Sequence, residues 1–493
     1  MRDRMAPIAP SAIDMLPTHV GADRENYAAL VDNPVHLAGE TPVSTFSIDV
    51  DTGAYSNVRR WLRNGQLPPQ DAIRIEEMIN YFDYSYQRPS NPDTPFVVHT
   101  ETGPAPWNER AQLLKIGIQG YEVEAEAIPA ANLVFLIDVS GSMNSPDKLG
   151  LLKQSIRLLV RQLDQNDRIA VVVYAGAAGV VLQPTPGNRG GEIMAAIDRL
   201  QAGGSTNGAA GIDLAYQLAR QGYVQGGVNR ILLATDGDFN VGTTNFEALI
   251  GLIERQRNSG VELTTLGFGT GNYNDHLMEQ LADAGNGNYA YIDTASEARK
   301  VLVDELSSTL FTIARDVKIQ IEFNPAVVSE YRLIGYSNRM LKREDFNNDQ
   351  VDAGDIGAGH TVTALYEVVL QGDVGYFEPL RYSPQPELTA NNEEWAFLKL
   401  RFKRPGQDSS ELLEIPVTAS THAPSEDFKF AAAVAAFGDA LRGGRYIGQF
   451  DWQSVAELAA SARGNDPYGY RSEFLQLVHT ARALSVESVA INQ

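Results

Sequence analysis

Three oxygen-bearing side chains stand at alternate positions just after an apolar run. Residues 133–137 read Leu-Val-Phe-Leu-Ile, and Asp138, Ser140 and Ser142 follow, with Gly141 among them. One carboxylate and two hydroxyls suit a hard divalent cation, because Mg²⁺ takes about six oxygen ligands and usually keeps some waters among them. One loop cannot supply that number of ligands, so further oxygens must come from elsewhere in the chain.

Two later loops offer oxygens of the same kind. Residues 203–207, Gly-Gly-Ser-Thr-Asn, precede an expected helix and contribute the hydroxyl of Thr206. A second apolar strand over 230–235 ends in Asp236 and Gly237. Ligands of open parallel sheets bind at the carboxyl ends of the strands, so we expect the three loops to meet there. A single polar loop of this kind would more simply cap a helix, but three such loops in order favour a shared site.

The three loops resemble the metal-ion-dependent adhesion site of von Willebrand factor type A (VWA) domains. That family's pattern is Asp-x-Ser-x-Ser, a distant Thr, and an Asp in a Thr-Asp-Gly loop. The resemblance covers about residues 130–315 and implies a bound Mg²⁺, with Mn²⁺ or Ca²⁺ as alternatives. A coordination position is left open for the Asp or Glu carboxylate of a protein partner. The implied ligands, all matched without substitution, are Asp138, Ser140, Ser142, Thr206 and Asp236.

The elements that must position these loops alternate between strand and helix. Strands are expected over 133–137, 168–174, 180–183, 230–235, 262–268 and 288–292. Helices are expected over 147–163, 190–200, 209–221, 245–259 and 274–284, with a closing helix over 296–313. This alternation predicts an α/β fold: a doubly wound, mostly parallel sheet of the VWA, Rossmann-like kind.

Strands of alternating polarity flank this unit on both sides. They are expected over 96–102 and 112–123 before it, and over 317–323, 329–334, 360–370, 394–402 and 411–417 after it. The simplest arrangement is one β-sandwich, split in sequence by the inserted α/β domain. Small helical segments are expected at both ends, over 56–64, 71–83, 426–441, 451–461 and 470–484.

The chain therefore divides into five expected parts. These are a flexible leader (1–43), flanking helices with the first sandwich strands (44–129), the VWA domain (130–315), the rest of the sandwich (316–420) and C-terminal helices (421–493). As a whole the chain resembles bacterial VWA proteins with an N-terminal flanking segment and a C-terminal domain of unknown function, the YfbK-like envelope family. Residues 47–56, Ser-Ile-Asp-Val-Asp-Thr-Gly-Ala-Tyr-Ser, and 352–360, Asp-Ala-Gly-Asp-Ile-Gly-Ala-Gly-His, carry this resemblance. It implies a location in the bacterial cell envelope, periplasmic or on the surface.

Composition excludes several classes of partner and site. The 493 residues carry a net charge of −22, which argues against nucleic acid or an anionic membrane as a partner. With no cysteine, disulfides and thiolate metal sites are excluded. No apolar run approaches the ~20 residues of a membrane span. Residues 1–43 also lack the apolar segment of ~7–15 residues found in a signal peptide. The protein is thus cytoplasmic, or its export or lipoprotein signal is missing from this chain.

A second acidic stretch, residues 345–349, begins like a calcium loop with Asp-x-Asn-x-Asp. It departs from the EF-hand pattern because Gln350 replaces the turn glycine and Ile356 replaces the bidentate Glu. The two interpretations are a different calcium cage and a solvated acidic turn. The candidate ligands of such a cage are Asp345, Asn347, Asp349, Asp352 and Asp355.

Two functions use the first metal site in different ways. One is adhesion or scaffolding, in which the cation coordinates a partner carboxylate without turnover. The alternative is a metal-assisted hydrolase or phosphatase, which needs a base or nucleophile beside the metal. The first loop lacks the second aspartate of an Asp-x-Asp pair, and none of the three loops contains His. Asp51-Thr-Gly matches an aspartic-protease loop, but the chain has no second such loop, so only a homodimer could complete the pair of aspartates. We therefore expect a binding protein and not an enzyme.

Overall fold

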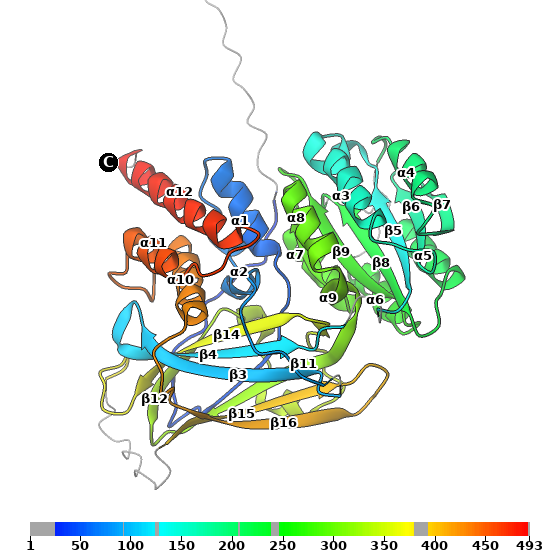
Figure 1. Cartoon of the computed structure of the whole chain (residues 1–493). Coiled ribbons are helices and arrows are strands. Elements are labelled where there is room, and N and C mark those ends of the chain that lie inside the picture. The colour runs from blue at the N-terminus through cyan, green and yellow to red at the C-terminus, as the bar shows by residue number, and fades with distance from the viewer. Residues whose placement is uncertain are drawn as a thin grey trace, which may run out of the picture.

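The fold combines an α/β domain, a two-sheet β-sandwich and a group of helices (Figure 1). The α/β domain is coloured cyan to green, the sandwich lies below it, and the helices combine blue and red segments from opposite ends of the chain. The computed structural model describes residues 25–91, 93–123, 128–205, 208–237, 246–378 and 393–491. Among the helices in these ranges, none combines the length and the hydrophobicity of a membrane span.

In the described residues, the α/β domain contains a six-stranded sheet with the order β10-β9-β8-β5-β6-β7. Neighbouring strands are parallel, except that the edge strand β7 runs antiparallel to β6. The strands are β5 (Ala131–Asp138), β6 (Arg168–Tyr174), β7 (Ala178–Pro186), β8 (Val228–Thr235), β9 (Glu262–Phe268) and β10 (Tyr289–Ile292). β5 and β8 are buried along their whole length, as expected for apolar strands covered on both faces. The predicted doubly wound, mostly parallel sheet is confirmed.

Helices cover the sheet, and separate apolar clusters lie against its two faces. They are α3 (Leu151–Val160), α4 (Gly190–Asp198), α5 (Gly208–Gln221), α6 (Phe246–Arg257), α7 (Asp275–Ala284), α8 (Ala295–Arg299) and α9 (Leu306–Leu310). The prediction of one closing helix over 296–313 is wrong. A π-helical turn over 300–304 separates α8 from α9, and the next strand already begins at Thr312. The backbone N–H of Glu305 donates to the carbonyl oxygen of Lys300 at 2.8 Å, five residues earlier, which is the hydrogen bond of a π turn.

The sandwich takes strands from both sides of the α/β domain. One sheet has the order β1-β12-β14-β4-β3, and the other has β13-β11-β15-β16, with β2 also paired to β11. Their bounds are β1 (His36–Leu37), β2 (Val43–Ser47), β3 (Phe96–Ala105), β4 (Asn108–Gly120), β11 (Thr312–Phe323), β12 (Val328–Ile334), β13 (Ile356–Gly357), β14 (Thr361–Leu370), β15 (Glu394–Lys403) and β16 (Ser410–Thr418). β4, before the insertion, pairs with β14, after it. The predicted split sandwich is therefore confirmed.

Helices from the two ends of the chain share one core. They are α1 (Gly53–Arg63), α2 (Ile75–Asn80), α10 (Glu426–Leu441), α11 (Trp452–Ser461) and α12 (Tyr470–Ile491). Phe82 lies edge-on against Phe430 and Phe474, with ring centroids 4.9 and 5.6 Å apart. The middle of α10 is buried on all sides, as its run of alanines permits. These segments are about 350 residues apart in the sequence, so their common core was not predicted.

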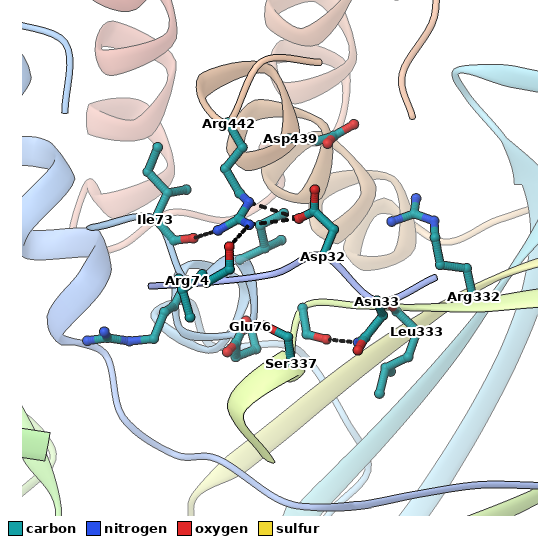
Figure 2. Close-up of a pocket in the computed structure, with 13 residues that line it drawn as sticks. Asp32, Asn33, Ile73, Arg74, Glu76, Arg332, Leu333, Ser337, Asp439 and Arg442 are labelled. Atoms are coloured by element: carbon teal, nitrogen blue, oxygen red, sulfur yellow. Dashed lines mark hydrogen bonds and ion pairs between the residues drawn. The ribbon is translucent and has the colours of Figure 1, made fainter. Parts of the chain in front are cut away.

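The expectation of a flexible leader fails for residues 25–43, which are extended but well anchored. Glu25 pairs with Arg60 at 2.6 Å, and β1 adds to the edge of the sandwich beside β12. Figure 2 shows Arg442 of the α10 C-terminus between Asp32 and the carbonyl of Ile73; its ion pair with Asp32 spans 2.9 Å. A cavity of about 20 Å³ beside this pair has the size of a single water molecule. These contacts are polar, so the pattern of apolar residues in the sequence could not predict them. Residues 1–24 lie outside the described residues.

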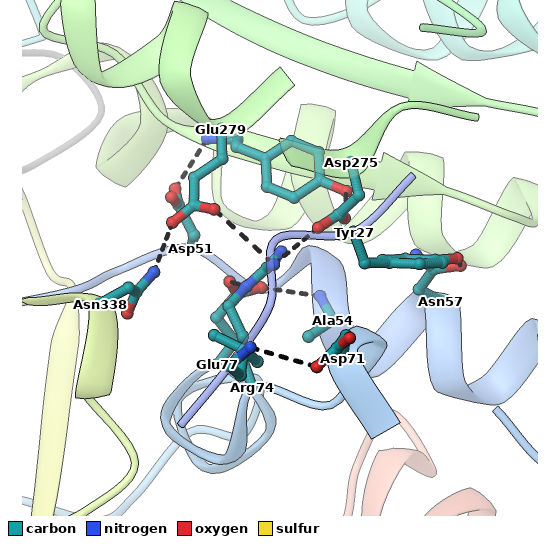
Figure 3. A network of polar contacts seen from close by, with 12 residues as sticks. Tyr27, Asp51, Ala54, Asn57, Asp71, Arg74, Glu77, Asp275, Glu279 and Asn338 are labelled. Atoms are coloured by element: carbon teal, nitrogen blue, oxygen red, sulfur yellow. Dashed lines mark hydrogen bonds and ion pairs between the residues drawn. The ribbon is translucent and has the colours of Figure 1, made fainter. Parts of the chain in front are cut away.

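A largely buried set of charges, the interdomain cluster, joins the α/β domain to α2 and to the sandwich; Asp283 at its rim is 46% exposed, and Figure 3 shows the part around Arg74. The cluster consists of six carboxylates and two guanidinium groups, namely Asp49, Asp51, Glu77, Asp275, Glu279, Asp283, Arg74 and Arg339. Arg74 contacts Asp275 at 2.6 Å and Glu279 at 3.7 Å. Burial raises the pKa of Glu279 to about 7. The cluster therefore contains more carboxylates than guanidinium groups, and most of these groups are shielded from water.

The motif at residues 47–56 belongs to this cluster, and its role is structural. The Asp51 carboxylate accepts a hydrogen bond from the backbone N–H of Tyr289 in β10 at 2.7 Å. Gly53 begins α1 against the same residue, and a Cβ there would lie 2.3 Å from Cε1 of the Tyr289 ring. Arg339 also reaches Asp51, at 3.3 Å. Asp51 of this Asp-Thr-Gly loop thus joins the segment before α1 to β10 of the α/β domain.

Candidate metal centre

Asp138 ends β5 at the carboxyl edge of the parallel sheet. Its Oδ1 accepts a hydrogen bond from the backbone N–H of Ser140 at 2.8 Å, and its Oδ2 accepts one from Oγ1 of Thr235 at 3.0 Å. The side chain is fully buried, and burial raises its pKa to about 6 even though these hydrogen bonds favour the charged form. Strand geometry and two donors therefore fix the orientation of this carboxylate.

Ser140 and Ser142 lie in the turn after β5, and their Oγ atoms are 3.0 Å apart. Two backbone hydrogen bonds of 2.7 and 3.1 Å join residues 139–141 to residues 203–204. The first two predicted loops therefore meet. Thr206, the predicted hydroxyl ligand of the second loop, lies outside the described residues, and its role stays a prediction.

Asp236 follows β8 and is fully buried. Its negative charge also raises the pKa of Asp138, so the two carboxylates share one electrostatic site. Oδ2 of Asp236 accepts hydrogen bonds from the ammonium of Lys148 at 3.0 Å and from Nδ2 of Asn272 at 3.2 Å. Lys148 also donates to Oδ1 of Asn272 at 2.8 Å. A cation and an amide thus hold one side of this aspartate.

Sequence reasoning missed Lys148 and Asn272 as contributors to the site, and it did not predict that Thr235 of the Thr-Asp-Gly loop donates to Asp138. Lys148 comes from a π-helical turn over 146–150, and Asn272 from the loop between β9 and α7. Neither residue belongs to the three-loop pattern. The one available signal is Gly269, where a Cβ would lie 2.2 Å from Cε of Lys148. The absence of a side chain at Gly269 leaves the space through which the lysine passes.

The donor set suits a hard divalent cation. Hydroxyl and carboxylate oxygens are the ligands that Mg²⁺ takes in proteins. In the ranges that the structure describes, no three His, Cys, Asp or Glu side chains are placed to hold a metal ion together. The candidate centre differs from such clusters because it combines two carboxylates with serine hydroxyls. Asp138, Ser140 and Ser142 would hold the cation, with Asp236 contributing charge from the third loop.

The second candidate set, the calcium cage at residues 345–355, does not converge. Each of its five side chains has a different partner, and the partners lie on separate segments. The pairs are Asp345 with the Lys342 N–H, Asn347 with Arg401, Asp349 with Ser410, Asp352 with Arg257 and Asp355 with the Asp316 N–H. This geometry favours the acidic turn over the cage.

Comparison with known proteins reveals matches along most of the chain. Family models described as "von Willebrand factor", "von Willebrand factor type A domain" and "Uncharacterized protein YfbK, C-terminal" match residues 21–115, 132–305 and 308–484. The uncharacterized protein YfbK of Escherichia coli (strain K12) is 49% identical over 485 residues, covering 97% of this chain and 84% of that protein. The chain belongs to the YfbK family of VWA proteins. The family resemblance predicted from sequence is thereby confirmed.

More distant likenesses surround the YfbK family. Inter alpha-trypsin inhibitor heavy chain 4 of Mus musculus is 27% identical over 186 residues, covering 36% of this chain and 18% of that protein. A solved von Willebrand factor type A protein from Catenulispora acidiphila covers 78% of this chain and 89% of its own, with 16% identity and a TM-score of 0.43. A VWA domain mediates protein interactions in general, so a protein-binding or scaffold role follows for this chain at that level.

Proposed function

We propose that this YfbK-family protein binds a protein partner through a divalent cation at the candidate metal centre. Asp138, Ser140 and Ser142 would hold the cation, and Thr206 and Asp236 would complete the set. Bound there, the cation would supply positive charge to the Asp or Glu carboxylate of a partner. The observation that supports this most directly is the Asp138 carboxylate, fixed by two donors beside two serine hydroxyls 3.0 Å apart.

The proposed function needs no turnover. The three loops contain no His to act as a base. The nearby ammonium of Lys148 is engaged by Asp236 and Asn272, so it is not placed as a catalytic group. We therefore propose a binding protein, with a metal-assisted hydrolase or phosphatase as the alternative. We also propose the bacterial cell envelope as its location, with the cytoplasm as the alternative.

Cation binding is tested by titrating the full chain with Mg²⁺, Mn²⁺ and Ca²⁺ in calorimetry and thermal unfolding. Saturating metal should raise the melting temperature, because a ligand at 100 times its Kd stabilises by about 2.7 kcal/mol. Asp138→Ala should remove the response. Asp198→Ala is the matched control, because this aspartate is half exposed and pairs with Arg157 at 3.0 Å. No response of the unaltered chain to any of the three ions would overturn the proposal.

Partner binding is tested by capture from envelope extract with Mg²⁺ and again with EDTA. A partner that is retained only with Mg²⁺, and not by Asp138→Ala, supports the proposed function. A partner retained under both conditions would place the interaction elsewhere on the molecule. The same preparations are assayed on generic phosphate, ester and peptide substrates. Metal-dependent turnover that disappears in Asp138→Ala would favour the hydrolase.

A further inference from the structure

The ammonium of Lys148 is held against the metal centre by the fold itself. The lysine side chain is only 8% exposed, and its Nζ lies 3.0 Å from Oδ2 of Asp236. Its stem crosses Gly269, where a Cβ would come within 2.2 Å of Cε and 2.3 Å of Cγ of the lysine. The backbone of Gly269 has φ +79°, a conformation that favours glycine. A lysine so enclosed cannot simply swing into solvent when the charge of the site changes.

Lys148 changes the electrostatic balance of the centre. Asp138 and Asp236 contribute two negative charges, and Lys148 contributes one positive charge, so the described charged groups sum to −1. A divalent cation would bring that sum to +1. Net charge in a buried place is costly, and it is relieved when an anion arrives. Without the lysine, the same two aspartates would neutralise the cation by themselves.

We propose that Lys148 strengthens the dependence of cation binding and carboxylate binding on each other. The ammonium weakens the hold of the site on a cation alone and strengthens the attraction of the loaded site for an anion. This inference rests on the proposed function, because it concerns the same cation. By linkage, an anion that binds better with the cation must also tighten the cation by the same factor. Lys148 thus acts on both binding steps through its charge and is not itself a ligand of the cation.

The test uses Mg²⁺ as the cation and acetate as the carboxylate probe. Mg²⁺ affinity of the full chain is measured by calorimetry in chloride and in acetate at equal ionic strength. Lys148→Met keeps most of the stem but removes the charge. Lys153→Met is the matched control, because Lys153 lies on α3 and donates to the carbonyl oxygens of Asp198 and Leu200, at 3.0 and 2.7 Å. Circular dichroism checks the fold of every variant.

In the unaltered chain and in Lys153→Met, acetate should tighten Mg²⁺ binding. In Lys148→Met, Mg²⁺ in chloride should bind about tenfold more tightly, because a nearby unit charge has been removed. The effect of acetate should then be largely lost. Lys148→Arg, which keeps the charge, should retain the effect of acetate. A purely structural role for Lys148 predicts a different pattern, namely weaker Mg²⁺ binding in Lys148→Met, because Asp236 loses a partner.

The outcomes separate this inference from the function beneath it. The coupling is overturned if Lys148→Met has the same Mg²⁺ affinity as the unaltered chain in both salts. It is also overturned if Lys148→Met binds Mg²⁺ more weakly. Either result leaves cation binding by the unaltered chain intact. Absence of Mg²⁺ binding in every protein overturns the proposed function and the inference with it. If Lys148→Met does not fold, acetate coupling is read from Lys148→Arg against Lys153→Met, and coupling lost in the arginine variant also counts against the inference.

Discussion

The candidate metal centre and the interdomain cluster both contain buried carboxylates at the edges of the VWA domain, but the partners of these carboxylates differ. In the interdomain cluster, six carboxylates surround Arg74 and Arg339. At the metal centre, a single ammonium touches Asp236, and Asp138 is held by neutral donors. Each carboxylate of the interdomain cluster thus contacts a guanidinium group, whereas Asp138 of the candidate metal centre accepts its hydrogen bonds from neutral donors.

The difference follows from the chemistry of the basic side chains. A guanidinium group presents five N–H donors in a rigid plane, so one Arg can satisfy several carboxylates at once. Arg339 does so by contacting carboxylates of both the α/β domain and residues 49–51. An ammonium is a compact point charge with three donors. Serine hydroxyls can turn toward a cation without any ion pair being broken, so the metal centre is the adaptable one.

The largest expected effect comes from removing one guanidinium group from the interdomain cluster. Arg74→Met should lower the free energy of unfolding by about 3–5 kcal/mol at neutral pH, because removing one partner leaves buried charges uncompensated. Arg74 is 1% exposed and contacts Glu77, Asp275 and Glu279. Urea unfolding of the full chain measures the loss. Arg63→Met is the control, because that side chain is 46% exposed and should matter much less. Equal losses in the two variants would show that the cluster does not hold the domains together.

The pH dependence of the interdomain cluster should be next in size. The pKa of Glu279 is raised from 4.5 to about 7, mainly by burial. The folded protein therefore holds this proton more tightly than the unfolded chain does. Its contribution to stability is fully present below pH ~4.5 and is lost as the pH rises through about 7.

Glu279→Gln stays neutral at every pH and should flatten this part of the profile. Between pH 5 and pH 8, its unfolding free energy should fall by less than that of the unaltered chain, by on the order of 3 kcal/mol. Gln can still accept the hydrogen bond that Asn338 donates to Glu279 at 2.7 Å. Glu254→Gln, on the exposed face of α6, should leave the profile unchanged. Parallel profiles for Glu279→Gln and the unaltered chain would mean that Glu279 keeps its charge when folded.

The two clusters also differ in how well the sequence predicts them. The metal centre follows local rules: an apolar strand ends in an oxygen-rich loop, and parallel strands bring such loops to one edge. The proximity of Asp138, Ser140 and Ser142 at this edge could therefore be predicted, whereas their role as metal ligands stays a prediction. The interdomain cluster depends on contacts such as Arg74 with Asp275, which are 201 residues apart and follow no period. The contact of Lys148 with Asp236 was not predicted for the same reason, because only the folded structure brings the two residues together.

A smaller effect is expected from the neutral donors of the metal centre. Oγ1 of Thr235 donates to Asp138 at 3.0 Å and accepts from the Gly237 N–H at 3.1 Å. Thr235→Val keeps the shape and strand preference but removes both bonds. Mg²⁺ affinity in calorimetry should fall roughly tenfold, as is typical when a group orienting a metal ligand is lost. Thr185→Val, on the edge strand β7, should not change it. Unchanged affinity in Thr235→Val would show that Asp138 needs no such support.

The smallest expected effect concerns Ca²⁺ at residues 345–355, which tests whether a run of acidic residues is enough to make a cation site. In Asp138→Ala, Ca²⁺ should leave the melting temperature unchanged, because no carboxylate there is free to turn without losing a partner. The Asp349 carboxylate accepts the Ser410 hydroxyl at 2.5 Å, and Asp352 pairs with Arg257 at 2.7 Å. Binding Ca²⁺ would require these bonds to break, whereas the serine hydroxyls of the candidate metal centre can reorient without breaking an ion pair.

Asp345→Ala in the Asp138→Ala background is the control for nonspecific binding of Ca²⁺ to this acidic protein, and it should behave identically. A Ca²⁺-dependent rise in the melting temperature of Asp138→Ala that Asp345→Ala removes would contradict the prediction. In that case the loop must rearrange around the ion, and the pairs at residues 345–355 would belong to the ion-free state. The ability of a group of carboxylates to bind a cation would then depend on how easily the carboxylates exchange their existing hydrogen-bond and ion-pair partners. The number of those partners would not decide it.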